Sequence, residues 1–391
     1  MFTLLRRTSC LNARYSRQGL VRSFPHGSST RTFYNQSVPH SQVPFYNRQE
    51  TESLTRLLKG HPALTLMLGP PNCGKTALTR HVTSQLRADG SREFQPLTVD
   101  LRSVDTTETG SFLEAFLRAG TQKAMYEVDS MYPCAKAAAQ VFAQLGNGLK
   151  EVKEVYPSER PVIVIDEAHY FKRMNDKAID AFLDFAVRHT VQEAQMHVIL
   201  TSSDPLFQDW LARRINHINF STLVLGDLSR QEAHDYFLQV VKAHPQLSEE
   251  KKNLLSSLDF DIPFKMTGGR MFFIRKYVDQ VHVFGYFDDP MDFEPVSNAY
   301  NAMLGSSETA ATTFKILINS PGYISHCELV KKIGSSVVKE MIERNLIHHR
   351  PKSNFSRDLI PSPTEPVVTA QSQPALRAME ALLISKFGYI D

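Results

Sequence analysis

Short apolar runs, separated by stretches with helical spacing, recur through residues 45–226 of the chain. Between the runs, apolar residues such as Leu78, Val82 and Leu86 lie four positions apart, on one face of a helix. Short buried strands that alternate with helices are typical of parallel sheets. The predicted strands cover residues 63–68, 97–101, 162–166, 198–200 and 220–225. The pattern therefore predicts an α/β fold with a parallel sheet.

The pattern becomes helical after residue 226. Ser229-Arg-Gln-Glu232 is a capping box that predicts a helix to about residue 243, and a second helix follows Thr267-Gly-Gly-Arg270. Residues 284–294 are acidic and aromatic, as in a connector, and the C-terminal part reads as helices followed by a two-stranded hairpin, which is typical of a winged helix. We expect an N-terminal segment at 1–44, an α/β core at 45–226, a helical subdomain at 227–283, a linker at 284–309 and a winged-helix-like domain at 310–391.

A glycine loop stands between the first predicted strand and the helix that begins at Lys75. Glycines let the backbone approach phosphate oxygens closely, Lys75 places an ammonium near the β- and γ-phosphates, and the Thr76 hydroxyl coordinates Mg²⁺. The loop therefore predicts a site for ATP or GTP with Mg²⁺. The predicted nucleotide-binding residues here are Gly69, Pro70, Pro71, Asn72, Cys73, Gly74, Lys75, Thr76 and Ala77.

Two acids end the buried run Val162-Ile-Val-Ile-Asp-Glu167. We expect Asp166 to bind Mg²⁺ together with Thr76, and Glu167 to orient and deprotonate the attacking water. A plainer interpretation of Glu167 is an acid exposed at a strand end. Asp166-Glu-Ala-His169 also spells a helicase box, but the second core and arginine motif of such helicases are missing from the sequence, so His169 is interpreted as a packing or coupling residue.

Polar residues also follow the next predicted strand. Of Thr201, Ser202 and Ser203, we choose Ser202 as the side chain that senses the γ-phosphate or the attacking water. Arg213 and Arg214 close the following helix, where an arginine can serve as a finger in its own subunit or in a neighbour. Two solvated charges favoured by the helix dipole are an equal alternative.

The order of these motifs resembles the archaeal-type ATPases of the STAND group, relatives of AAA+ proteins within the ASCE class of P-loop proteins. The resemblance covers residues 45–281. The matching pieces are Phe45-x-x-Arg48-x-Glu50, the glycine loop with Leu68, Ile163-Val-Ile-Asp-Glu-Ala168, Ile199-Leu-Thr-Ser-Ser203, Leu228-Ser-x-x-Glu-Ala233 and Thr267-Gly-Gly269.

The resemblance implies a five-stranded P-loop core, a small helical domain and a winged helix that folds over the nucleotide, acting together as an ATP-dependent conformational switch. It places Phe45 and Arg48 beside the adenine, which favours ATP. Arg270 and Met271 stand where the family often has a proline, and Arg270 looks like the second sensor arginine of AAA+ proteins. The clade within STAND and AAA+ therefore stays open.

The amino-acid composition of the N-terminal segment predicts where the protein is located in the cell. The chain has 391 residues, and its first 46 hold six arginines, many Ser and Thr, and neither lysine nor acid, which is typical of a mitochondrial transit peptide. A merely disordered basic tail is the alternative. Without those arginines the formal charge of +3 becomes −3, so the remaining chain lacks the charge signature of a nucleic-acid binder. Four scattered cysteines favour a reducing compartment, and no apolar run approaches the roughly 20 residues of a membrane span.

These observations leave three hypotheses. The first is a mitochondrial-matrix ATPase switch that acts on a protein partner and can oligomerise with nucleotide. The second is a DNA-associated AAA+ factor that contacts mitochondrial DNA through its winged helix, with Arg350 and Lys352 as contacts. The candidate recognition helix around residues 336–344 has balanced charges, which disfavours DNA. The third is an idle scaffold that retains nucleotide without releasing phosphate.

Overall fold

The computed structural model describes residues 45–46, 48–105, 109–120, 142, 146, 160–353 and 358–388. The predicted transit peptide lies outside these residues. None of the described helices is long and apolar enough to cross a bilayer.

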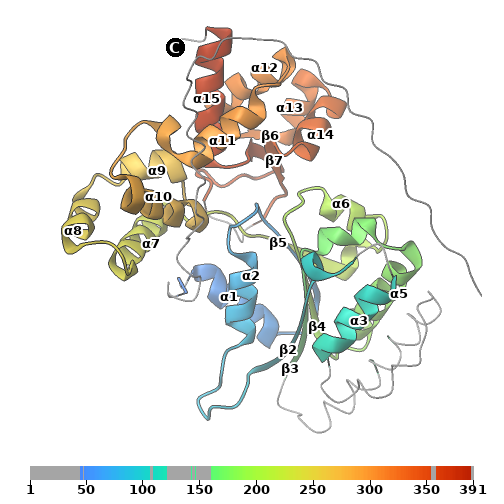
Figure 1. The fold of residues 1–391 in the computed structure, drawn as a ribbon. Helices are drawn as coiled ribbons and strands as arrows, with labels where there is room; N and C mark the ends of the chain where they lie inside the picture. The colour runs from blue at the N-terminus through green and yellow to red at the C-terminus, as the bar shows by residue number, and fades with distance from the viewer. Residues whose placement is uncertain are drawn as a thin grey trace, which may run out of the picture. The chain divides into compact units, whose positions relative to one another are not determined.

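Five parallel strands form the central sheet of the N-terminal part (Figure 1). Its order is β2-β3-β4-β1-β5, so that β4 lies between β1 and β3. Because all the strands run in the same direction, their carboxyl ends meet at one edge of the sheet. The strands are β1 (Leu64–Leu68), β2 (Phe94–Asp100), β3 (Arg160–Asp166), β4 (His197–Ser202) and β5 (Phe220–Val224). The predicted α/β fold and five-stranded sheet are confirmed.

Helices cover both faces of this sheet, and alternate strand residues point into separate cores. Ile163 and Ile165 of β3 face one core, whereas Val162 and Val164 face the other. The helices on the first core are α3 (Thr109–Gly120), α5 (Asp176–Val187) and α6 (Phe207–Ala212), and those on the second are α1 (Gln49–Lys59) and α2 (Lys75–Thr83). Burial on both faces explains the continuous apolar runs.

The helices after the sheet begin as the sequence predicts. Ser229 and Glu232 form both hydrogen bonds of a capping box at the start of α7 (Arg230–Ala243). Helix α8 (Glu249–Ser257) follows, then α9 (Asp261–Thr267), and α10 (Met271–Phe284) begins after the paired glycines with Arg270 as its N-cap.

The C-terminal part contains more regular structure than the sequence pattern predicted. Its order is α11 (Glu294–Met303), α12 (Glu308–Ile318), β6 (Tyr323–Ser325), α13 (His326–Ile333), α14 (Ser335–Glu343), β7 (Ile347–Arg350), β8 (Val367–Ala370) and α15 (Gln373–Phe387). Strand β8 lies between β6 and β7 in an antiparallel sheet, so the predicted hairpin gains a third strand.

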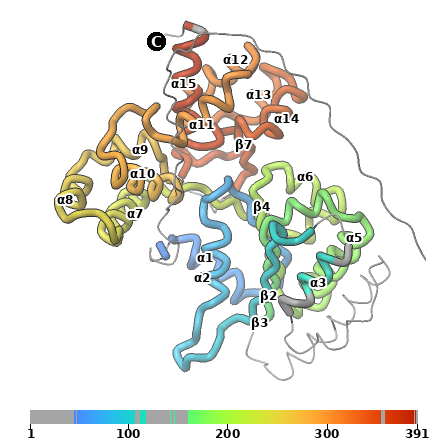
Figure 2. The backbone as a smooth tube through the Cα atoms, viewed as in Figure 1, coloured from blue at the N-terminus to red at the C-terminus, as the bar shows by residue number. Residues whose placement is uncertain are grey.

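The predicted linker at 284–309 is structured. It holds a short 3₁₀ helix, Pro290–Asp292, and helix α11, whose Val296 and Met303 are buried in a core shared with α15. One continuous hydrophobic core runs from Leu228 to Leu383, and Figure 2 traces the backbone of the helices from α7 to α15 that contribute to it. The connector prediction is corrected because these apolar side chains pack within that core.

Candidate functional site

The glycine loop is shaped by two positions that admit no side chain. A Cβ on Gly69 would lie 2.4 Å from the Leu225 carbonyl oxygen. Gly74 has φ +100°, and a Cβ there would lie 2.7 Å from the terminal methyl of Met271. Gly74 also precedes α2, and no described side chain caps that helix, so its first amides are available to an anion. The loop therefore fits phosphate groups.

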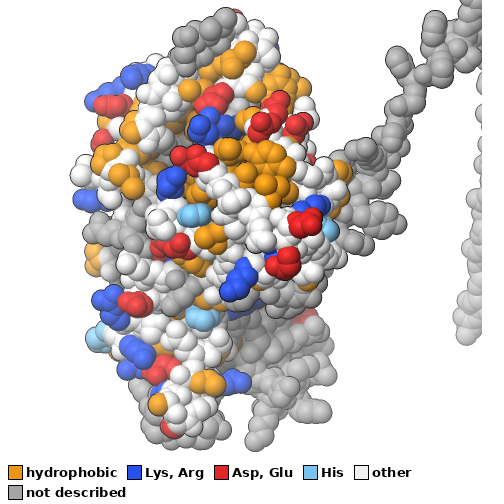
Figure 3. All heavy atoms as spheres, turned by 90° about the vertical axis from the view of Figure 1, so that its left-hand side faces the viewer, with side chains coloured by type: hydrophobic (Ala, Val, Ile, Leu, Met, Phe, Trp, Pro, Cys, Tyr) orange, Lys and Arg blue, Asp and Glu red, His pale blue; other side chains and the backbone are white. Residues whose placement is uncertain are grey.

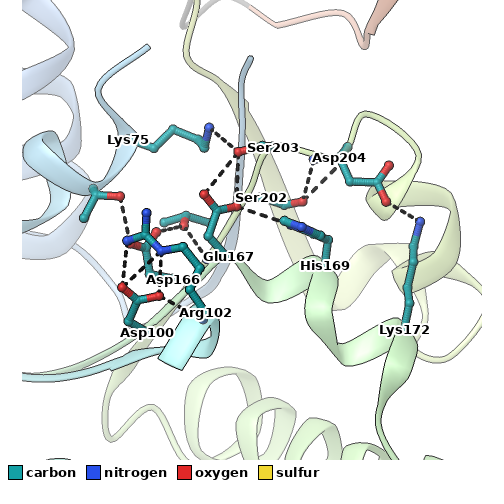
Figure 4. Close-up of polar contacts among 12 residues, drawn as sticks. Lys75, Asp100, Arg102, Asp166, Glu167, His169, Lys172, Ser202, Ser203 and Asp204 are labelled. Atoms are coloured by element: carbon teal, nitrogen blue, oxygen red, sulfur yellow. Dashed lines mark hydrogen bonds and ion pairs between the residues drawn. The ribbon is translucent and has the colours of Figure 1, made fainter. Parts of the chain in front are cut away.

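Lys75 connects the loop to the ends of two other strands (Figure 4). Its buried Nζ donates to the carbonyl oxygens of Gly69 at 2.8 Å and Pro70 at 3.0 Å, and to Ser203 Oγ at 3.0 Å. Ser203 Oγ in turn donates to Glu167 Oε2 at 3.1 Å. A polar chain thus runs from the loop after β1, through the end of β4, to the carboxylate after β3.

Asp166 is the most enclosed acid of the site. Its Oδ2 accepts from Thr76 Oγ1 at 2.8 Å, its Oδ1 accepts from Thr201, and Arg102 Nη2 lies 3.4 Å from Oδ2. Hydroxyl and carboxylate oxygens are the ligands that Mg²⁺ prefers, and such sites use few protein ligands beside the phosphates. The Thr76 and Asp166 oxygens therefore fit Mg²⁺.

Glu167 adopts φ +54°, and its backbone amide donates to Thr201 Oγ1 at 3.2 Å. Burial raises the pKa of Glu167, but His169, Lys75 and Ser203 together outweigh burial and hold that pKa below its ordinary value. His169 Nδ1 lies 3.3 Å from Oε2, so His169 couples directly to this acid. The carboxylate is therefore ionised at neutral pH and can accept a hydrogen bond from water.

The residue at the end of β4 that faces the site is Ser203 rather than Ser202. Ser202 Oγ accepts from the Asp204 amide at 3.1 Å and is fully buried, so it supports the turn. Consecutive residues of an extended chain point in opposite directions, and Ser203 is the one directed toward Lys75 and Glu167. Ser203 therefore replaces Ser202 as the candidate side chain that senses the γ-phosphate or the attacking water.

The two arginines at the end of α6 lie apart from the glycine loop. Arg214 pairs with Asp176 and, at 2.8 Å, with Asp180, and it stacks over Trp210. Arg213 is exposed. Arg214 is thus held by two acids of α5. Within one subunit, this favours surface charges at a helix end over an arginine finger.

Arg48 and Phe45 lie against the loop and α2. Arg48 is buried, pairs with Glu50 at 3.2 Å and donates to the carbonyl oxygens of Cys73 at 3.2 Å and Gly226 at 3.1 Å. Phe45 stacks on His81 of α2, with ring centroids 3.9 Å apart. Arg48 therefore joins the N-terminal segment, the glycine loop and the end of the sheet, and its guanidinium is committed to carbonyl oxygens.

Arg270 connects the segment after β5 to the turn before α15. It pairs with Asp227 through two contacts of 2.9 and 3.1 Å, and it donates to the Gln371 carbonyl oxygen at 2.9 Å. The next residue, Met271, lies against Gly74. Arg270 is thus bound to the segment that follows β5 and to the start of α15, and its neighbour reaches the loop.

Strand β7 adds residues that the sequence analysis did not place at the site. Arg350 forms a buried ion pair with Asp358 at 2.7 Å, and this pair fills the space beside Gly226. Burial lowers the pKa of His348 far below its ordinary value, with further lowering by Arg350, Arg270 and Lys75. The sequence carries no recognisable signal for this placement, because Gly226 and the Arg350–Asp358 pair lie more than 100 positions apart.

Comparisons with known proteins gave one matching family profile and several solved structures that superpose on this chain. The sequence profile of an ATPase domain predominantly from Archaea matches residues 45–270. The Walker-type ATPase PABY2304 of Pyrococcus abyssi superposes with a TM-score of 0.54 at 11% identity, covering 86% of this chain and 96% of that one.

The Aeropyrum pernix ORC2 protein superposes with a TM-score of 0.44 at 12% identity, covering 88% and 97% of the two chains. Of these two similarities, the one to the Pyrococcus protein supports the α/β fold described above. A search of the curated proteins gave no match.

Proposed function

We propose that this chain, which belongs to the family of ATPase domains found predominantly in Archaea, binds ATP with Mg²⁺ and hydrolyses it to reset a conformation that a protein partner recognises. The chain of contacts from Lys75 through Ser203 to Glu167 carries the proposal. Lys75, the proposed phosphate-binding cation, and the ionised Glu167 carboxylate lie at the two ends of this hydrogen-bonded path, which supports the proposal.

Each residue of the site has a defined task in this proposal. The α2 amides and Lys75 bind the β- and γ-phosphates, and Thr76 and Asp166 hold Mg²⁺. Bound Mg²⁺ neutralises charge that develops on the phosphate oxygens. Glu167 orients the attacking water and accepts its proton, while Ser203 keeps the carboxylate aligned with Lys75.

The switch is proposed from the contacts around Gly226 and Asp227. Arg48 and the Arg350–Asp358 pair lie at Gly226, and Arg270 pairs with Asp227. A phosphate group that draws Lys75 away from its carbonyl partners acts on the same loop that Arg48 and Met271 contact. Nucleotide turnover can thereby bias the position of the C-terminal part.

Residues 308–370 form a helix, a strand, two helices and then a two-stranded hairpin. This order supports the winged-helix proposal. The six N-terminal arginines support a location in the mitochondrial matrix. A nucleotide-dependent oligomer, with an arginine contributed by a neighbour, remains part of the proposal.

The DNA-binding alternative is less well supported. Arg350 is buried against Asp358, so of the two expected contacts only Lys352 is exposed. On α14, Lys339 lies 3.6 Å from Glu343 and Arg344 lies 3.5 Å from Glu340. On the face shown in Figure 3, the described basic and acidic side chains are interspersed. Such a surface lacks the basic stripe that a duplex requires.

Substitution of Lys75 tests nucleotide binding. Lys75→Ala removes a charge-assisted contact to phosphate, so affinity for a fluorescent ATP analogue with Mg²⁺ should fall about 100-fold, or ~2.7 kcal/mol. Lys172→Ala, a surface change that removes a pair with Asp204, is the matched control and should bind as the wild type does. Equal affinity of the Lys75→Ala and wild-type proteins would contradict the proposed site.

A further inference from the structure

Arg102 joins the two acids that end neighbouring strands. It lies in the short 3₁₀ helix Leu101–Ser103, directly after β2, where Asp100 is in register with Asp166 of β3. Its Nη2 lies 2.7 Å from Asp100 Oδ2 and 3.4 Å from Asp166 Oδ2 (Figure 4). One cationic nitrogen therefore bridges two carboxylates, one of which is the expected Mg²⁺ ligand.

The guanidinium is fixed on Asp100. Arg102 Nε donates to Asp100 Oδ1 at 2.9 Å, parallel to the Nη2 contact, and the Arg102 backbone amide donates to the same Oδ1 at 3.0 Å. Such a bidentate pair restrains the position of the charge. The hydrogen bonds and charge of Arg102 lower the pKa of Asp100 despite its partial burial, so both partners are ionised at neutral pH.

The position of Arg102 matters for any cation that approaches Asp166. The same Oδ2 atom accepts from Thr76 Oγ1, so Arg102 and Thr76 meet at one oxygen. Half of the Arg102 side chain is exposed, with 51% relative accessibility against 2% for Asp166. A divalent cation that reaches Asp166 from solvent on this side therefore meets a fixed positive charge.

We propose that Arg102 is a positioning residue that makes divalent-cation binding at Asp166 depend on the nucleotide. The proposal rests on the proposed function and deepens it. Asp100, Asp166 and Glu167 bring negative charges to this edge, and Lys75, Arg102 and Arg80 bring positive ones, but of these cations Arg102 is the one that contacts both Asp100 and Asp166. Arg102 opposes a free cation, and the phosphates of ATP supply the negative charge that overcomes this opposition.

The plainer role, a surface ion pair that only holds the end of β2, predicts a different result. Such pairs contribute little to folding and leave metal binding unchanged. In Arg102→Gln the two carboxylate oxygens lose the cation between them, and a hard divalent cation can bridge both. A gain of metal affinity without nucleotide is therefore specific to the proposed role.

The test is Mn²⁺ binding to the full chain, measured by electron paramagnetic resonance of free Mn²⁺ with and without a non-hydrolysable ATP analogue. Without the analogue, Arg102→Gln should bind Mn²⁺ at least about tenfold more tightly than the wild type. Adding Asp100→Asn to that variant should remove most of the gain, and Arg102→Lys, which keeps the charge, should resemble the wild type. Arg80→Gln is the control, because Arg80 acts on Asp100 only through its charge.

The outcomes separate the two proposals. The inference is overturned if wild type and Arg102→Gln bind Mn²⁺ equally without the analogue, while the wild type gains affinity when the analogue is added. Tight binding to the wild type without the analogue also overturns the inference alone. A wild type that binds no Mn²⁺ even with the analogue contradicts the proposed function, and the inference with it.

Discussion

Glu167, the proposed general base, shows how a short motif can locate a candidate site residue while its surroundings set its charge. Its position follows from the strand that ends at Asp166, which a continuous apolar run makes visible in the sequence. Its pKa depends on burial and on His169, Lys75 and Ser203, which come from three separate segments. The net lowering keeps this carboxylate ionised in a partly enclosed site.

Removal of His169 should move the pH dependence of hydrolysis. His169 lowers the pKa of Glu167, so His169→Ala should raise that pKa. The acidic limb of the kcat profile, where Glu167 becomes protonated, should then shift to higher pH. His217→Ala is the control, because His217 lies in a separate 3₁₀ helix before β5. Steady-state measurements should extend well below the ordinary pKa of a glutamate, because the acidic limb of the wild type lies there, and an unchanged limb in His169→Ala would exclude this coupling.

Individual site residues were predictable where a motif fixes them to a strand end. Thr76, Asp166 and Glu167 come together because β1 and β3 run in the same direction in one sheet. The sequence analysis chose Ser202 instead of Ser203, because the sequence alone does not show which of the two side chains points toward Lys75 and Glu167. Arg102 escaped notice because an arginine after a strand carries no signal without the neighbouring Asp166.

Strand β7 shows that a hydrophobic pattern can predict a strand without predicting the contacts of its polar residues. The sequence predicted a strand here, and β7 is one, but its polar residues lie buried beside segments far away in the chain. Ser353, just beyond β7, accepts a hydrogen bond from the Val224 amide of the edge strand β5 at 3.2 Å. Helix α11 was likewise assigned to a linker, because its apolar partners on α15 are about 80 positions distant.

The buried pair of Arg350 and Asp358 should be important for stability. Asp358→Asn removes the carboxylate that pairs directly with the buried Arg350 guanidinium, which should cost roughly 3–5 kcal/mol of unfolding free energy. Denaturant unfolding of the full chain provides the measurement. Glu343→Gln removes an exposed helical pair with Lys339 and should cost about 0.5 kcal/mol or less. Equal small losses in the two variants would show that the Arg350 pair is dispensable.

The parts of the chain from residue 45 onward meet around Gly226 and Asp227. Arg48 reaches this point from the N-terminal segment, Arg270 from the start of α10, and Arg350 from β7. A Cβ on Gly226 would lie 2.0 Å from Asp358 Oδ1, so the close approach of β7 requires a glycine here. Three buried arginines thus each connect a different segment to one short turn, and this turn is where the proposed switch is expected to act.

Single-turnover hydrolysis by Glu167→Gln tests the central claim most directly. The substitution keeps the shape of the side chain and removes its ability to accept a proton, so the protein should bind the ATP analogue as tightly as wild type. Hydrolysis of bound ATP should slow by at least about 100-fold, the scale of a lost general base. Hydrolysis at the wild-type rate by purified Glu167→Gln would contradict the account.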